Sequence, residues 1–239
     1  ISKSIELMRG KMEFLPEDPY FIYSTNVKST EKIKENKLPD SKAVLECVID
    51  FSKGKDLAGI YSSGGIYSGF ANSFGQKNWF EKYSFDLSWS VYHSDDKATK
   101  ERYCGFVWDK NVFENKMNKS FIELEIVSKT PVTIKPGKYR AYLSPSALSD
   151  FIGHLGWRTF GLKRHREKSS PLLKMTEEGR LLNSSVSIYE NIKDGAGPDF
   201  LKTGFIKRPN VELIKTGKFN DYLVSPRSSI EYKVEHNGD

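Results

Sequence analysis

One short segment of the chain carries residue types from which a metal or acid–base site could be built. The sequence SDFIGH, residues 149–154, places Ser149, Asp150 and His154 within two helical turns. Catalytic zinc needs three protein ligands from His, Asp, Glu or Cys, and a serine hydroxyl is not a useful one. Asp150 and His154 could therefore contribute to a metal site only with groups from elsewhere. A lone histidine on a helix more often packs or forms hydrogen bonds.

The same segment is expected to form an amphipathic helix after a short strand over 138–143. Ser144 can cap the free N–H groups of the first turn, and Pro145 suits the first helical position. Gly156 is a suitable end. Apolar residues at i, i+3, i+4 and i+7 predict one buried face, namely Leu148, Phe151, Ile152 and Leu155.

The remaining histidines offer weaker candidates. His93 precedes Asp95 and Asp96 at an expected hairpin tip, where aspartates usually accept hydrogen bonds from local backbone N–H groups. His165 and His236 have no partner at a spacing typical of metal ligands.

The glycine-rich stretch over 57–76 predicts neither a phosphate loop nor a nucleophile elbow. Gly64 and Gly65 instead predict a hairpin turn between strands at 57–63 and 66–74. Serines in these strands are expected to form polar faces: Ser62, Ser63 and Ser68. Because glycine permits close backbone approach, an extended peptide could lie against this sheet.

The spacing of apolar residues predicts the strands and helices that position these residues. Residues 83–91 alternate between apolar and polar side chains, as in a half-buried strand, and 100–108 returns beside it. Further helices are expected at 4–14, 41–51 (capped by Asp40 or Ser41), 113–124 and after Pro226; further strands are expected at 186–189, 211–215 and 219–224. The predicted class is α+β, an antiparallel meander and hairpins packed against helices. We expect an N-terminal α+β domain over 1–130 and the start of a β-rich C-terminal domain over 131–239, continuing beyond the end.

The composition of the chain disfavours several classes of protein. The net charge is +6, with a pI near 9.0, but the charge is spread along the chain except in the run 158–168. We expect that run to be an exposed loop rather than a phosphate-binding patch, because no aromatic residues are interleaved with it. No apolar run approaches the ~18 residues of a membrane helix, and no secretion signal is evident. Cys47 and Cys104 are expected to be reduced, half-buried thiols of a cytoplasmic protein.

An ordered set of sequence blocks resembles the TldD/TldE family, also called PmbA, peptidase U62 or modulators of DNA gyrase. The blocks extend over most of the chain from residue 57: the glycine-serine stretch 57–76, Asn78–Trp79, Trp89–His93, Lys135–Tyr139, Leu143–Leu148 and Leu223–Gly238. TldD-like members carry a His-Glu-x-x-x-His zinc motif on the helix corresponding to 145–156.

Placed without a gap, that motif falls on 149–154. Ser149 stands at the first ligand, Asp150 at the general-base Glu, and His154 is kept. Asp is one methylene shorter than Glu and places its carboxylate differently relative to a bound water. The resemblance implies a TldE-like chain with no cofactor of its own and no catalytic activity alone.

The implied function is that of a non-catalytic subunit in a heteromeric TldD/TldE zinc metallopeptidase that cleaves small or unfolded peptides. Zinc is then expected in a TldD-like partner. A hetero- or homo-oligomer, a peptide substrate and no membrane association are expected. Two alternatives stay open: an independent peptidase whose site includes Asp150 and His154, and a nucleic-acid-associated modulator of DNA gyrase.

Overall fold

The computed structural model describes residues 2–93, 97–156 and 159–238. It divides into two compact units. Residues 28–159 and 194–199 form one, which we call the sheet unit. Residues 1–27, 160–193 and 200–239 form the other, which we call the terminal unit. The expected boundary between residues 130 and 131 falls within the sheet unit and stays a prediction.

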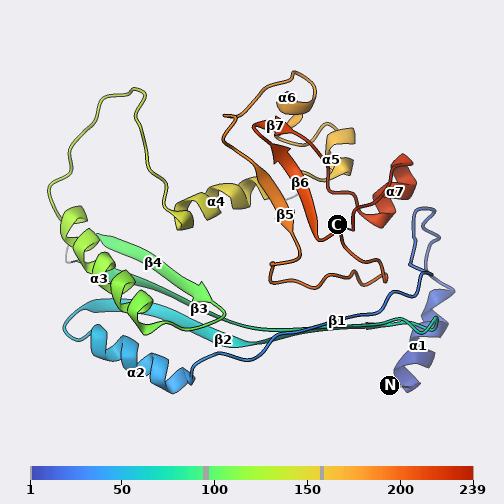
Figure 1. The fold of residues 1–239 in the computed structure, drawn as a ribbon, viewed down its shortest axis with the longest axis horizontal. Helices are drawn as coiled ribbons and strands as arrows, with labels where there is room; N and C mark the ends of the chain where they lie inside the picture. Colours follow the sequence, from blue (N-terminus) through green and yellow to red (C-terminus); the bar gives the residue numbers. More distant parts are fainter. Residues whose placement is uncertain (1, 94–96, 157–158, 239) are drawn as a thin grey trace. The chain divides into compact units, whose positions relative to one another are not determined.

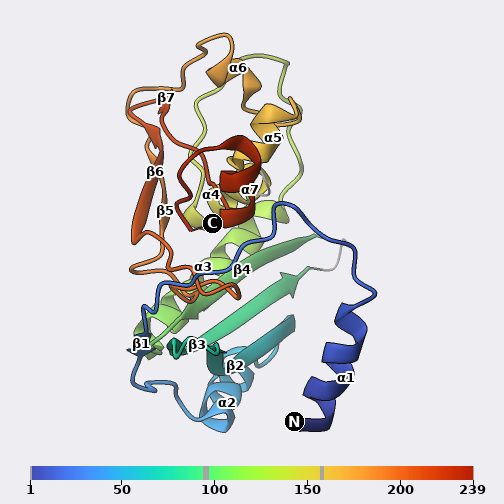
Figure 2. The same cartoon turned by 90° about the vertical axis from the view of Figure 1, so that its right-hand side faces the viewer.

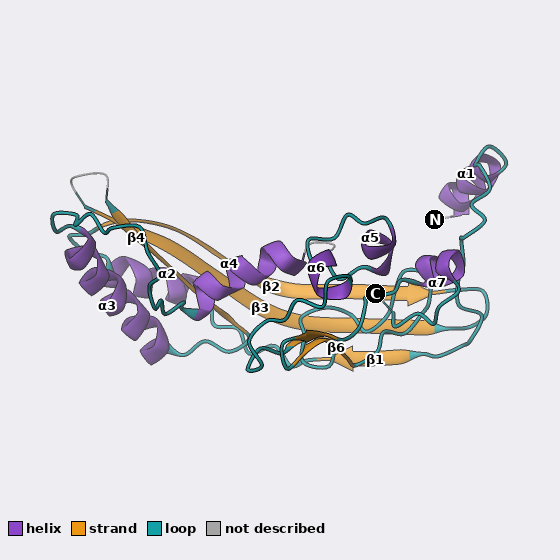
Figure 3. Cartoon of the chain, turned by 90° about the horizontal axis from the view of Figure 1, so that it is seen from above, coloured by secondary structure: helices purple, strands orange, loops and turns teal. Residues whose placement is uncertain are grey.

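The sheet unit is built around one long central strand, β3. Its elements, labelled in Figure 1, are β1 (Thr30–Ile33), α2 (Ser41–Phe51), β2 (Asp56–Ala71), β3 (Lys77–Tyr92), β4 (Ala98–Gly105), α3 (Lys110–Val127) and α4 (Pro145–Gly156). β2 pairs antiparallel with β3 along its whole length. The opposite edge of β3 pairs in parallel with β1 and, further along, antiparallel with β4. Figure 3 shows β2 and β3 running side by side. The predicted meander β2–β3–β4 is confirmed.

The predicted turn at Gly64–Gly65 is wrong, because β2 runs through both glycines without interruption. The turn lies at the end of β2 instead, where Gly75 has a φ of +93°. There Asn72 Oδ1 accepts hydrogen bonds from the N–H groups of Phe74 and Gln76, each at 3.1 Å. Because β3 is sixteen residues long, both glycines pair with residues of β3, and the strand continues through them.

The main hydrophobic core lies between β3 and the two helices α2 and α3, as the alternation over 83–91 predicted. Its buried members are Phe85, Leu87, Trp89, Val91, Tyr103, Phe113, Met117 and Leu124. The indole Nε1 of Trp89 donates a hydrogen bond to Ser120 Oγ at 3.0 Å, so this buried donor is satisfied. α2 begins as predicted, with Asp40 Oδ2 accepting from the Ala43 N–H at 3.1 Å.

The first half of β3 buries the opposite face. Asn78, Phe80 and Lys82 are buried there, whereas the buried residues of the second half are the odd-numbered ones. The pairing of β3 with β2 has no register shift. Side chains therefore alternate regularly along the strand, and the covering layer changes sides.

The terminal unit contains short helices and a small three-stranded sheet. Its elements are α1 (Ser2–Met12), α5 (Leu162–Arg166), α6 (Leu173–Thr176), β5 (Ile188–Asn191), β6 (Asn210–Lys215), β7 (Lys218–Phe219) and α7 (Pro226–Tyr232). The predicted hairpin turns at Thr216 and Gly217, which have φ of +44° and +81°. Ser225 Oγ caps α7 by accepting from the Ser228 N–H at 3.2 Å. The α+β class is confirmed.

Two local predictions are wrong. Residues 138–143 are irregular, since no strand of the described chain lies beside them to complete a ladder. The basic run, of which residue 158 lies outside the described residues, folds into α5 rather than a loop. Leu162 and His165 are buried there. Lys163 Nζ lies 3.6 Å from a carboxylate oxygen of Glu231 on α7. The run therefore forms a helix because it packs apolar side chains and makes an ion pair with a residue from another part of the chain.

No helix in the described part of the chain has the length and apolar character to cross a bilayer.

Candidate functional site

Helix α4, which carries the three candidate residues, forms as the sequence predicts. Ser144 Oγ accepts the Ala147 N–H at 3.3 Å, Pro145 is the first residue, and Gly156 is the last. Its apolar face is not covered, however. Phe151 is 60% exposed and Leu148 45% exposed, and no residue of the helix is buried. The prediction of a buried face is wrong for the described residues, where the helix has amphipathic spacing but no covering layer.

The first turns of α4 meet β4 and α3 at a cavity of about 410 Å³. Most of its lining residues are polar or charged types: Glu101, Arg102, Tyr103, Cys104, Lys116, Lys119, Ser144, Pro145, Ser146, Ser149 and Asp150. Two of the three predicted residues, Ser149 and Asp150, therefore face one space. His154 is not part of the lining and is exposed on α4. The expectation that His154 packs or forms hydrogen bonds is wrong among the described residues.

Glu101 is the least exposed charged group of this cavity. Its carboxylate oxygens lie 3.2 Å from Lys116 Nζ and 3.7 Å from Lys119 Nζ. Burial acts to raise the pKa of Glu101, but hydrogen bonds from the Arg102 backbone N–H and from Lys116 outweigh it and lower the pKa below its ordinary value. Glu101 is therefore held as a carboxylate between two ammonium groups.

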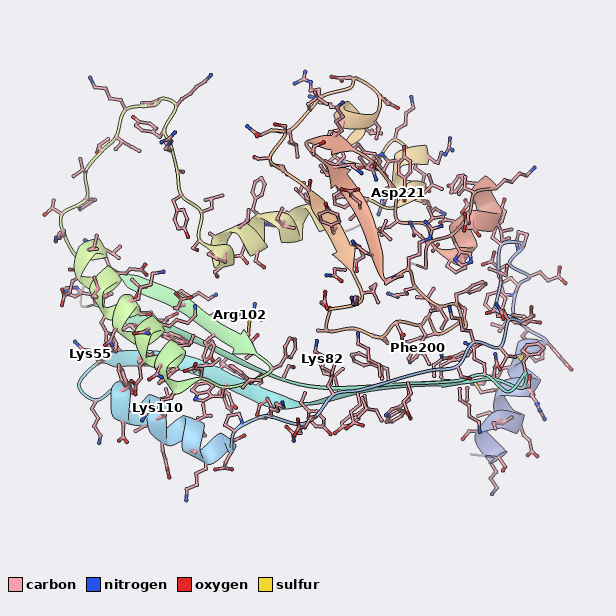
Figure 4. The ribbon with its side chains drawn as sticks, viewed as in Figure 1. Lys55, Lys82, Arg102, Lys110, Phe200 and Asp221 are labelled. Carbon is pink, nitrogen blue, oxygen red and sulfur yellow. The ribbon has the colours of Figure 1, made fainter. Side chains whose placement is uncertain are left out.

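Arg102 is fixed by Asp86 on the neighbouring strand. Its Nε lies 3.0 and 2.9 Å from the two carboxylate oxygens of Asp86. Hydrogen bonding to Asp86 raises the pKa of Arg102, with smaller contributions that include Asp150 on α4. Arg102 and Lys82 project from the same face of the sheet (Figure 4). The cavity thus presents a fixed guanidinium, a carboxylate on α4 and serine hydroxyls, groups that hold polar parts of a ligand.

This residue set does not fit a catalytic zinc ion. Ser149 is a poor ligand, His154 lies outside the cavity, and Asp150 alone cannot supply three ligands. Among the residues that the structure describes, no three His, Cys, Asp or Glu side chains gather in a way that could hold a metal.

The other predicted candidates lie elsewhere. The His93 N–H donates to the Lys97 carbonyl at 2.7 Å, as in a turn, while Asp95 and Asp96 lie outside the described residues. The His165 ring is buried with centroids 5.0 Å from Phe219 and 4.9 Å from Tyr222. The ring of His236 packs against Phe205 at 4.7 Å.

Both cysteines are free thiols. Cys47 is half-buried as expected, but Cys104 is exposed; it lies on the same face of the sheet as Asp86 and lines the cavity beside α4.

No sequence pattern predicted that Glu101, Arg102 and the two lysines line a cavity. One signal was present, since Lys116 and Lys119 are three residues apart on a predicted helix and so share a face. Nothing in the sequence shows that β4 and α4 meet beside them.

Residues 136–239 match the sequence model of the PmbA/TldA metallopeptidase C-terminal domain. This part of the chain belongs to that family. The resemblance to the TldD/TldE family is thereby confirmed. No curated protein sequence matches the chain.

Solved structures share the fold of almost the whole chain. A proposed modulator of DNA gyrase from Bacteroides thetaiotaomicron is 15% identical, with a TM-score of 0.67 over 96% of this chain and 57% of that one. TldE from Thermococcus kodakarensis is 14% identical, with a TM-score of 0.67 over 99% and 57%. A proposed gyrase modulator from Thermotoga maritima is 13% identical, with a TM-score of 0.66 over 92% and 54%. The chain spans little more than half the length of these proteins.

Proposed function

We propose that this chain is a TldE/PmbA-like subunit of a heteromeric peptidase, without catalytic zinc of its own. In this proposal a TldD-like partner holds the zinc and cleaves small or unfolded peptides. The observation that carries it is the composition of α4, which forms a capped helix but has Ser149 and Asp150 where the resemblance places a ligand and a general base. The cavity beside α4 supports a binding role, because fixed charges line it.

Metal content tests the absence of a zinc site. We expect the purified chain, incubated with zinc and then desalted, to hold far less than one equivalent by elemental analysis. A double variant, Ser149→His with Asp150→Glu, restores two groups of the motif and should retain more zinc. The matched control is Ser146→His, which adds a histidine to the same helix outside the motif. Stoichiometric, tightly held zinc in the unaltered chain contradicts the proposal.

Complex formation tests the partner role. A TldD-like protein with an intact His-Glu-x-x-x-His motif should form a complex of defined mass with this chain, measured by light scattering after size exclusion. The complex should cleave an unfolded peptide, and the chain alone should not. Cleavage by the chain alone that a chelator stops supports an independent peptidase instead. Absence of association removes the partner role.

A further inference from the structure

Strand β2 forms an unprotected edge of the sheet. One side of it pairs with β3 from Asp56 to Ala71, and no strand in the described chain pairs with the other side. Figure 2 shows β2 as the outer strand beside β3 and β4. Edge strands are normally protected by charged residues, proline or bulges. From Leu57 to Ala71 there is no charged residue and no proline, and the ladder has no register shift. Such an edge can accept another extended chain.

Aromatic rings and a carboxylate lie beside this edge, on one face of the β2–β3 pair. We call Tyr67, Trp79, Glu81 and Tyr83 the aromatic–carboxylate cluster. The phenol of Tyr83 donates to Glu81 Oε1, and Trp79 Nε1 donates to Glu81 Oε2 at 3.4 Å. Tyr67 Oη donates to Tyr83 Oη at 3.2 Å. These hydrogen bonds orient the carboxylate among three rings.

The rings form a surface that reaches the edge strand. Tyr67 is 55% exposed and Trp79 40% exposed. The Tyr67 ring lies over Gly65, and the Trp79 ring lies against Gly69, where an added Cβ would come within 3.2 Å of ring carbons. A side chain at either glycine would therefore displace the neighbouring ring.

The strands carry two carboxylates on this face, Glu31 and Glu81, and one lysine, Lys77 at the start of β3, although the chain carries a net charge of +6. Glu31 of β1 pairs in register with Trp79 and so shares its face. Neither Glu31 nor Glu81 takes part in an ion pair within the described residues. A carboxylate offers about four acceptor positions, and the cluster uses two of those of Glu81. Exposed aromatic faces beside a carboxylate attract ammonium and guanidinium groups.

We propose that the β2 edge binds an extended peptide with lysine or arginine at alternate positions. Its backbone continues the sheet, and its cationic side chains, which share one face of the added strand, lie over the aromatic–carboxylate cluster. A second copy of this chain fits less well, because β2 contains no lysine or arginine and would leave Glu81 uncompensated. This site is independent of the proposed pairing with a TldD-like partner.

Peptide binding to the chain alone tests the charge requirement. The probes are two labelled octapeptides, one alternating threonine with arginine and one alternating threonine with glutamate. Fluorescence anisotropy should show binding of the arginine peptide only. Glu81→Gln should weaken it about tenfold, as expected for loss of a charged hydrogen-bond partner, and Trp79→Leu should weaken it several-fold. Asp56→Asn, at the other end of β2, is the matched control and should leave affinity unchanged.

A third probe tests strand addition. The arginine peptide methylated on alternate backbone nitrogens keeps its charges but loses donors for the sheet, so it should not bind. Circular dichroism establishes that the Glu81→Gln and Trp79→Leu variants are folded. Equal affinity for the arginine and glutamate peptides, unchanged binding by both variants, or equal binding of the methylated peptide each overturns the proposal. So does a dimer of this chain through β2 that binds no peptide. None of these results depends on zinc or on a partner.

Discussion

The two halves of β3 are buried in different ways. In the second half, Phe85, Leu87, Trp89 and Val91 enter an apolar core beneath α2 and α3. In the first half, the buried side includes polar side chains that are paired by hydrogen bonds. Gln76 Nε2 donates to Asn78 Oδ1 at 2.8 Å, and Asn78 Nδ2 donates to Thr30 Oγ1 at 2.9 Å and to the Lys28 carbonyl at 3.0 Å.

The second half of β3 therefore contributes mainly to folding stability, whereas the first half leaves side chains exposed to solvent. The apolar half gains free energy from area removed from water, and its outward face carries mainly serines and charged groups. The polar half holds β1 against β3 through specific hydrogen bonds, and its other face leaves Tyr67 and Trp79 exposed. We therefore expect substitutions in the second half to affect folding most and substitutions in the first half to affect β1 and the exposed cluster.

The largest effect should come from Trp89→Ala. Trp89 is 2% exposed and contacts the Phe113 ring, so the substitution leaves a cavity and removes the donor to Ser120. We expect a loss of about 3–5 kcal/mol in the free energy of unfolding, measured by urea denaturation followed by circular dichroism. Trp79→Ala in the other half is the matched control, with a loss below about 1 kcal/mol. Similar losses for both tryptophans would contradict the distinction between the halves.

An intermediate effect is expected for Asn78→Leu. The substitution keeps the side chain's approximate volume but removes one hydrogen bond each from the Lys28 carbonyl, Thr30 Oγ1 and the Gln76 amide. The bond from Gln76 Nε2 to the Lys28 carbonyl, at 3.1 Å, remains. The expected cost is about 1–3 kcal/mol. Ser88→Ala, on the half-buried face of the second half, should change the same denaturation midpoint very little. A cost for Asn78→Leu no greater than for this control would mean that the polar network does not hold β1.

The smallest effect should be a pH dependence at Lys82. Its Nζ donates to the Gly195 carbonyl at 2.9 Å and lies 3.7 Å from the Phe106 ring centroid. Burial lowers the pKa of Lys82 below the ordinary 10.5, and the nearby Lys32 and Lys34 lower it further, partly opposed by Asp194. The folded state therefore binds this proton less tightly than the unfolded chain does, and its stability rises as the pH rises through the folded pKa toward 10.5.

The Lys82→Met variant should lack this rise of folding stability with pH. The difference in unfolding free energy between the unaltered chain and the variant should move in favour of the unaltered chain as the pH approaches 10.5. Lys100→Met, which removes an exposed lysine of β4, should give a difference that does not change with pH. A flat difference for Lys82→Met would show that burial does not disfavour its charged form.

The sequence determined the features that depend on near neighbours. The alternation over 83–91 predicted a half-buried strand, Asp40, Ser144 and Ser225 predicted helix starts, and Thr216–Gly217 predicted a hairpin turn. Each follows from a periodicity or from a hydrogen bond within a few residues. The resemblance also places Ser149 and Asp150 at two positions of the family's zinc motif, which is an expectation from the sequence alone.

Tertiary structure decided what depends on distant partners. Gly64 and Gly65 extend rather than turn because β3 lies beside them, and the basic run folds because Leu162 and His165 become buried. The cavity joins Glu101, Lys116 and Asp150 from three elements, which no local pattern relates. The apolar–polar alternation along β3 is also continuous, so it does not predict that the buried face changes from one side of the strand to the other. Spacing fixes which side chains share a face, but only the packed chain decides which face is covered.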